Sequence, residues 1–109
     1  MKKNIVFGSS GLVGSAFYKL LKNNKNFIFY SKNDNRFKKF NLNSNIKNFY
    51  YKDINNCYFF SSPRILKKNF VTNQFRLEFE WLKKIVSNIK INKLIYISSS
   101  SVYYKKNHI

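Results

Sequence analysis

The sequence predicts an α/β fold in which helices cover both faces of a parallel sheet. Short apolar runs, typical of buried strands, alternate with longer segments whose apolar residues recur at helical spacing. All three glycines, Gly8, Gly11 and Gly14, lie between the first of these runs and the first of these helical segments. With 109 residues, the chain is expected to form one domain, 1–109, with about five strands.

Five short apolar runs account for the expected strands, because each is bounded by glycine, proline or polar residues. The strands are expected at Lys3–Phe7, Phe27–Tyr30, Phe40–Leu42, Cys57–Phe60 and Lys93–Ile97. Since helical segments separate these runs, the strands are expected to run parallel rather than as hairpins.

Three helices are expected between these strands. The first begins at Leu12 and ends near Asn23, and its apolar residues share one face: Leu12, Val13, Ala16, Phe17, Leu20 and Leu21. Ser44 is expected to cap a second helix that extends to about Lys52. The third extends from about Ile65 to Ile89, with an apolar stripe at steps of four and three: Phe75, Phe79, Leu82, Val86 and Ile89.

The charge balance is strongly basic, with 21 Lys+Arg against 4 Asp+Glu and a formal net charge of +17. Such a balance suggests an anionic partner. The lysines are spread along the chain, however, and Asn, Ile, Phe and Tyr, which share A/T-rich codons with Lys, are also abundant. Codon bias therefore explains the excess better than a dedicated nucleic-acid surface, and a general attraction for phosphate-bearing ligands is the favoured interpretation.

The remaining composition narrows the class of protein. No run of 18 apolar residues occurs, so the sequence predicts neither a membrane span nor a membrane partner. The lone Cys57 cannot form an internal disulfide, and a cytoplasmic protein is the simplest expectation. A single histidine, His108, leaves too few ligands for a zinc site, so no metal is expected. Glu78 and Glu80 are two positions apart on the third helix, and both are expected to be surface charges.

The glycine window carries the clearest chemical signal. Gly8 allows a sharp turn off the first strand, Gly11 allows the backbone to approach a pyrophosphate, and Gly14 allows the helix to pack closely on the sheet. The new helix then offers unbonded N–H groups and the positive end of its dipole to phosphates. A strand-to-helix turn without a ligand is the alternative.

The end of the second strand bears on which dinucleotide would bind. Many NAD sites place an acid there to bind the ribose hydroxyls, but here Lys32 follows the strand and Asp34 lies farther on, in a polar loop. Lys32 and Arg36 are cations where the 2′-phosphate of NADP would lie. This favours NADP over NAD, although both could also be solvated loop charges.

Two motifs carry a family resemblance. The spacing Gly-x-x-Gly-x-x-Gly, together with the segment Leu94–Tyr103, resembles the extended branch of the short-chain dehydrogenase/reductase superfamily, the NAD-dependent epimerases, dehydratases and reductases of nucleotide sugars. The resemblance implies a Rossmann fold with strand order 3-2-1-4-5-6, whose later strands and substrate domain are absent from these residues. It also implies that Ser99 hydrogen-bonds a substrate oxygen.

The resemblance assigns further positions. Asn41 and Leu42 stand where the family often has Asp-Leu beside the adenine, and Ser61 stands where small residues often lie against the cofactor. Asn73 matches an asparagine carried by the long helix of this branch. The expected cofactor contacts are Gly8, Ser10, Gly11, Leu12, Val13, Gly14, Lys32, Asn41, Leu42 and Ser61.

The family's Tyr-x-x-x-Lys catalytic pair is not found in this sequence: four residues after Tyr103 comes Asn107. We therefore expect an inactive, cofactor-binding portion of such an enzyme, with a nucleotide-sugar substrate and a homodimer belonging to the complete parent protein. A non-catalytic dinucleotide-binding module or decayed remnant is the alternative, and a basic nucleic-acid-binding protein is a third. Leu94–Ile97 is expected to form an apolar edge strand that promotes aggregation.

Overall fold

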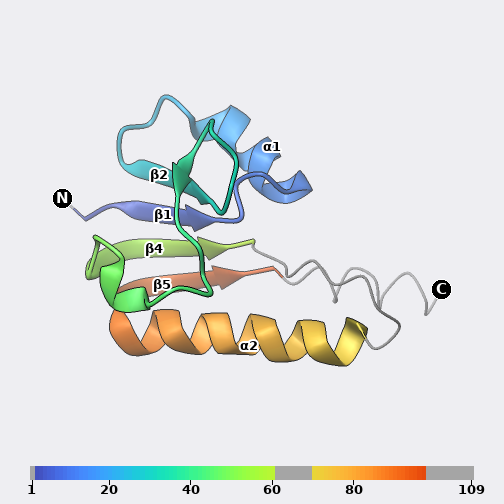
Figure 1. The fold of residues 1–109 in the computed structure, drawn as a ribbon. Coiled ribbons are helices and arrows are strands. Elements are labelled where there is room, and N and C mark those ends of the chain that lie inside the picture. Colours follow the sequence, from blue (N-terminus) through green and yellow to red (C-terminus); the bar gives the residue numbers. More distant parts are fainter. Residues whose placement is uncertain (1, 61–69, 98–109) are drawn as a thin grey trace.

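The computed structural model describes residues 2–60 and 70–97 of the chain, with residues 70–75 described for the backbone only. Its elements in chain order are β1 (Asn4–Phe7), α1 (Leu12–Leu21), β2 (Phe27–Ser31), β3 (Lys38–Lys39), the 3₁₀ helix η1 (Ile46–Asn48), β4 (Asp53–Phe59), α2 (Phe70–Asn88) and β5 (Lys90–Tyr96). The strands form one parallel sheet in the order β3-β2-β1-β4-β5 (Figure 1). The predicted α/β class and strand order are confirmed, and the arrangement is Rossmann-like.

The two helices cover opposite faces of the sheet because side chains alternate along β1. Ile5 and Phe7 point into one core, which includes Ile85 of α2, while Val6 points into the other core, against which Phe17 of α1 packs. In Figure 1, α1 and α2 accordingly lie on opposite sides of the strands. The predicted covering of both faces is therefore confirmed for the described residues.

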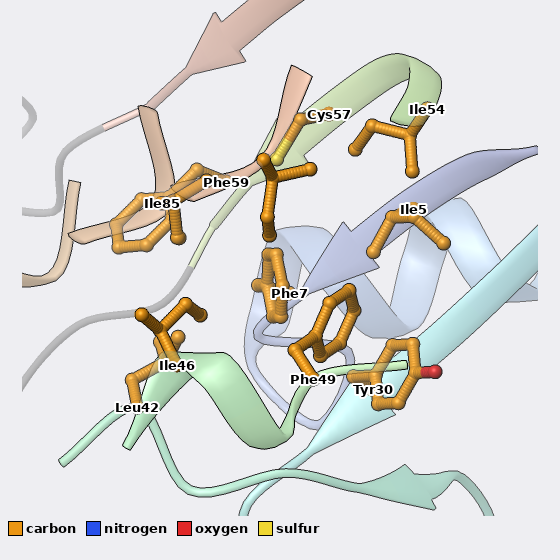
Figure 2. Close-up of a cluster of buried hydrophobic side chains, with 11 residues drawn as sticks. Ile5, Phe7, Tyr30, Leu42, Ile46, Phe49, Ile54, Cys57, Phe59 and Ile85 are labelled. Carbon is orange, nitrogen blue, oxygen red and sulfur yellow. The ribbon is translucent and has the colours of Figure 1, made fainter. Parts of the chain in front are cut away.

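Phe7 and Phe49 form the centre of the core on the α2 side (Figure 2). Their ring centroids are 5.4 Å apart, and Phe49 also contacts the ring of Tyr30 at 5.0 Å. Burial of one such phenylalanine contributes about 1.5–3 kcal/mol. The segment that follows η1 thus closes the core over β1 and β2, beside the part covered by α2.

The third strand and the second helix differ from their predictions. The strand is Lys38–Lys39, which pairs with the end of β2, and not Phe40–Leu42. Asn41 instead forms a turn, in which its side chain accepts the N–H of Asn43. The predicted helix beginning at Ser44 is only the short η1, because the backbone becomes extended at Phe49 and carries that ring into the core. The cap is the side chain of Asn45, which accepts the N–H of Lys47.

The buried stripe of α2 is rotated relative to the predicted one. Phe79 and Val86 are 62% and 52% exposed, whereas Ile85 is fully buried. The prediction that Glu78 is a surface charge is wrong: it is 1% exposed, and the Tyr96 hydroxyl donates a 2.5 Å hydrogen bond to its carboxylate. That bond makes the burial of a carboxylate tolerable. The side chain of Phe75 and residues 65–69 of the predicted helix lie outside the described part.

The helix α1 is also turned from its prediction, since Leu12 and Leu20 are exposed and Gly14 is buried. β5 lies at the edge of the sheet, as predicted, with Leu94, Tyr96 and Ile97 at least partly open to solvent. Within residues 2–60 and 70–97, no helix combines the length and apolar character needed to cross a membrane.

Candidate functional site

A pocket of about 750 Å³ opens at the carboxyl edge of the sheet, where β1 and β2 end. In parallel α/β sheets, ligands bind at this edge, at the point where the strand order reverses. Here that point lies between β1 and β4. The described wall residues come from the strand ends, the glycine loop, the segment after β3 and α2: Phe7, Gly8, Ser10, Gly11, Tyr30, Ser31, Lys32, Asn33, Asp34, Phe40, Asn41, Leu42, Asn43, Phe60, Leu77 and Trp81.

Two of the three glycines are required by the chain's own geometry. Gly8 has φ of 84°, in the left-handed region that favours glycine. A Cβ on Gly14 would lie 2.0 Å from the carbonyl oxygen of Gly8, so only glycine fits where α1 crosses the loop. The N–H of Ser9 donates to the carbonyl of Tyr30, which fixes the loop against β2. Together these contacts set the position of the first turn of α1.

Gly11 is different, because nothing in the described chain requires a glycine there. Its backbone is extended, with φ of −74°, and a Cβ would meet its nearest described neighbour, the Gly8 oxygen, at an ordinary 3.6 Å. It lines the pocket as the N-cap of α1, and no side chain caps this helix end. The N–H groups of the first turn are therefore left for another acceptor.

A chain of hydrogen bonds joins the glycine loop to the end of β2. The hydroxyl of Ser31 donates to the Ser10 hydroxyl at 3.2 Å and accepts the Asp34 N–H at 3.3 Å. Ser31 is buried, so this bond lies inside the pocket wall. Ser31 is a wall residue that was not predicted, although it directly follows the predicted strand Phe27–Tyr30.

The charged groups on this wall are arranged differently from the expectation. Arg36 does not line the pocket: its guanidinium binds the Asp34 carboxylate, with the shortest contact at 2.7 Å, and lies over the ring of Phe37. Hydrogen bonds from Arg36 lower the pKa of Asp34 to about 2. Lys32 is therefore the only cation on the pocket wall among the described residues, and Asp34 is a carboxylate on the same wall.

The far wall is held by α2. The Trp81 indole N–H donates to the Asn43 side chain at 2.9 Å, and the Lys84 ammonium lies 3.4 Å from the carbonyl oxygen of Leu42. These bonds fix the turn that carries Asn41 and Leu42 against the helix. Trp81 was not predicted as a pocket residue, because it contacts the turn at Asn41–Asn43, where the sequence predicts the end of a strand.

The structure brings together most of the predicted contacts that it describes. On the wall lie Gly8, Ser10, Gly11, Lys32, Asn41 and Leu42. Leu12, Val13 and Gly14 belong to the first turn of α1 and are not among the wall residues. Ser61 and Ser99 lie outside the described residues, and Asn73 is described only as part of the backbone of α2.

Comparison of the chain with protein-family models, curated proteins and solved structures gives no match. Among the described residues, no three His, Cys, Asp or Glu side chains cluster in a way that could hold a metal ion. The candidate site therefore rests on the geometry of the glycine loop and the pocket beside it.

Proposed function

We propose that this chain binds a dinucleotide, NADP or NAD, in the pocket at the carboxyl edge of the sheet. We further propose that it is the cofactor-binding part of an extended short-chain dehydrogenase-type enzyme acting on nucleotide sugars. Such a cofactor supplies hydride transfer when bound. The alternative is a dinucleotide-binding module without catalysis.

Gly11 is the observation that carries the proposal. The positive φ of Gly8 and the close packing of Gly14 on the loop explain why these two residues are glycines. Neither explanation applies to Gly11. A glycine without an internal reason, at the uncapped N-terminus of α1 and on the pocket wall, is explained if a pyrophosphate comes into contact with the backbone there. The helix dipole and the first-turn N–H groups would then bind the phosphate oxygens.

Lys32 and Asp34 favour different forms of the cofactor. Lys32 supports NADP, because an ammonium group binds a 2′-phosphate through charge-assisted hydrogen bonds. Asp34 supports NAD, because a carboxylate accepts hydrogen bonds from ribose hydroxyls and repels a phosphate. We propose NADP as the preferred cofactor, since Arg36 already binds the Asp34 carboxylate.

Calorimetric titration with NADP and NAD tests the proposal on wild type, Gly11→Val and the control Leu20→Ala. Leu20 is exposed at the opposite end of α1. We expect Gly11→Val to weaken binding of both dinucleotides at least tenfold, because the valine side chain would occupy the pyrophosphate position, while the control binds as wild type does. Equal affinity of wild type and a folded Gly11→Val protein would refute the proposal.

Lys32→Asp tests the preference for NADP separately. Loss of a charge-assisted hydrogen bond costs about 1.5–3 kcal/mol, a shift of about 10- to 150-fold toward NAD in the ratio of the two affinities. An unchanged ratio would show that Lys32 is a solvated loop charge, while leaving the assignment of the glycine loop intact.

A further inference from the structure

The topology gathers lysines at the edge of the sheet opposite the pocket. Because the strands are parallel, the amino ends of β1, β2, β4 and β5 meet at one edge, from which the arrows of β1, β4 and β5 in Figure 1 point away. Lysines stand directly before or at the start of β1, β4 and β5 and two residues before β2. With Lys47 of η1 they form what we call the basic edge: Lys2, Lys3, Lys25, Lys47, Lys52 and Lys90.

Hydrogen bonds connect the segments that carry the basic edge. The Lys3 ammonium donates to the carbonyl of Lys25 at 3.1 Å, which joins the starts of β1 and β2. The Lys90 N–H donates to the carbonyl of Lys52 at 2.8 Å, which joins the starts of β5 and β4. The Lys52 ammonium donates to the carbonyl of Lys47 at 2.7 Å. The ion pair of Lys2 with Asp53, the first residue of β4, joins these two groups. The backbones of Lys3, Lys25, Lys52 and Lys90 are therefore close in space, although these residues are far apart in the sequence.

The charge of the basic edge is largely uncompensated. Of its lysines, only Lys2 pairs with a carboxylate in the described structure, that of Asp53 at 3.2 Å. Lys3 and Lys52 are held by neutral carbonyls, which fix their ammonium groups without neutralising them. Like charges held side by side repel one another, and a bound polyanion relieves that repulsion.

An aromatic side chain accompanies these charges. Tyr50, two residues before Lys52, is 81% exposed. Its ring packs edge-on against Tyr51 at 4.8 Å, and Tyr51 packs on the core. The ring is thus supported on one side and open to solvent, which is the arrangement on which an unstacked base can stack.

We propose that the basic edge binds a single-stranded polynucleotide, with phosphates on the lysines and a base on Tyr50. A duplex would offer no free base face to this tyrosine. Because the dinucleotide pocket lies at the other edge of the sheet, the proposal is independent of cofactor binding.

Fluorescence anisotropy with labelled 20-nucleotide oligouridylate and oligothymidylate tests the proposal, and the two arms distinguish RNA from DNA. Four lysine–phosphate contacts would give a slope of log affinity against log salt of about −3. Affinity should then fall roughly 50-fold between 50 and 200 mM salt. No binding of either oligomer at 50 mM salt, or sedimentation with phosphatidylserine vesicles in place of oligomer binding, would overturn the proposal.

Two matched triple variants locate the interaction. Lys25→Glu/Lys52→Glu/Lys90→Glu reverses the charge of three of the six lysines of the basic edge, and Lys38→Glu/Lys39→Glu/Lys83→Glu makes the same change in net charge at exposed positions elsewhere. We expect the first to weaken binding more than tenfold and to reduce the salt slope by about 2, with little effect of the second. Equal losses would show attraction by net charge alone and overturn the assignment.

Tyr50→Ala and Tyr50→Phe test the proposal without a change of charge, and they do so even if the triple variants fail to fold. Loss of base stacking should weaken binding at least about fivefold in Tyr50→Ala, and Tyr50→Phe should restore it. Wild-type affinity in Tyr50→Ala would overturn the stacking role. Unchanged dinucleotide titrations are expected in the Tyr50 variants and in Lys25→Glu/Lys52→Glu/Lys90→Glu, because the pocket is at the opposite edge.

Discussion

Replacement of Gly14 by alanine should destabilise the fold, whereas the same change at Gly11 should not. At Gly14 the new Cβ would lie 2.0 Å from the Gly8 carbonyl oxygen, and contacts below 3.0 Å are essentially never tolerated. The helix must therefore move by at least 3.0 − 2.0 = 1.0 Å from the loop. Both partners are backbone, so no side-chain rotation can relieve the clash.

The expected loss in the free energy of unfolding of Gly14→Ala follows from two opposing effects. Overpacking costs about 3 kcal/mol at the upper end of its usual range, while alanine is favoured over glycine inside a helix by about 1 kcal/mol. The net loss of about 2 kcal/mol corresponds to a fall in melting temperature of about 8–16 °C for a domain of this size. At Gly11 the Cβ has room, so loss of an N-cap glycine and gain in unfolded-state entropy nearly cancel.

Thermal melting followed by circular dichroism measures both variants, and dinucleotide titration of the same samples completes the comparison. Gly14→Ala should melt well below wild type, and Gly11→Ala should melt within about 3 °C of it. A Gly14→Ala protein as stable as wild type would refute the steric reasoning. An unstable Gly11→Ala protein would show that the fold itself requires a glycine at position 11, which would remove the main support for the cofactor site.

Four further predictions rest on single contacts. Asp34→Asn should make the free energy of unfolding less dependent on pH below about pH 4. The pKa of the Asp34 carboxyl is lowered to about 2, so the ionised carboxylate adds stability above about pH 4 that is lost as pH falls toward 2. Urea unfolding between pH 2 and 5 checks this. Burial raises the pKa of the Cys57 thiol to about 12, so a thiol reagent at pH 8 should react only after unfolding, and rapid reaction of the native protein would contradict it. A double-mutant cycle with Glu78→Gln and Tyr96→Phe should give a coupling of at least about 1 kcal/mol; additive effects would mean that the bond contributes nothing. Exposed Leu94 on the edge strand β5 and Ile97 directly after it should promote association as salt screens the net charge of +17, and light scattering that shows a monomer at 0.5 M salt would contradict this.

Most of the strands and the glycine loop could be predicted because both depend on local patterns, whereas the strand order was an expectation from the family resemblance. The apolar runs around Ile5 and Cys57 are short and end at glycine or polar residues, a pattern typical of buried strands. Gly8 and Gly14 are required by the backbone of the strand-to-helix turn itself, through its positive φ and its close packing. Lys32 was placed at the pocket edge because it lies just beyond a predicted strand, whereas Asn41 and Leu42 were placed there by the family resemblance.

Other features could not be predicted because they depend on contacts between distant segments. Asn41 lies between two apolar residues, a pattern typical of a strand, yet its side chain stabilises a turn. Glu78 is buried where Tyr96, on another element, donates a hydrogen bond to it. Arg36 was a candidate phosphate ligand until the geometry of its loop placed Asp34 within its reach.

The charge of the chain is the case in which topology changes the interpretation most. Along the sequence the lysines are dispersed, and dispersed lysines favour codon bias over a binding surface. A parallel sheet, however, collects every strand start at one edge and every strand end at the other. Lys3, Lys25, Lys52 and Lys90 are therefore brought together by the same arrangement that brings Gly8 and Ser31 together at the pocket. Since the two edges are separated by the length of the strands, substitutions at one edge should leave binding at the other unchanged.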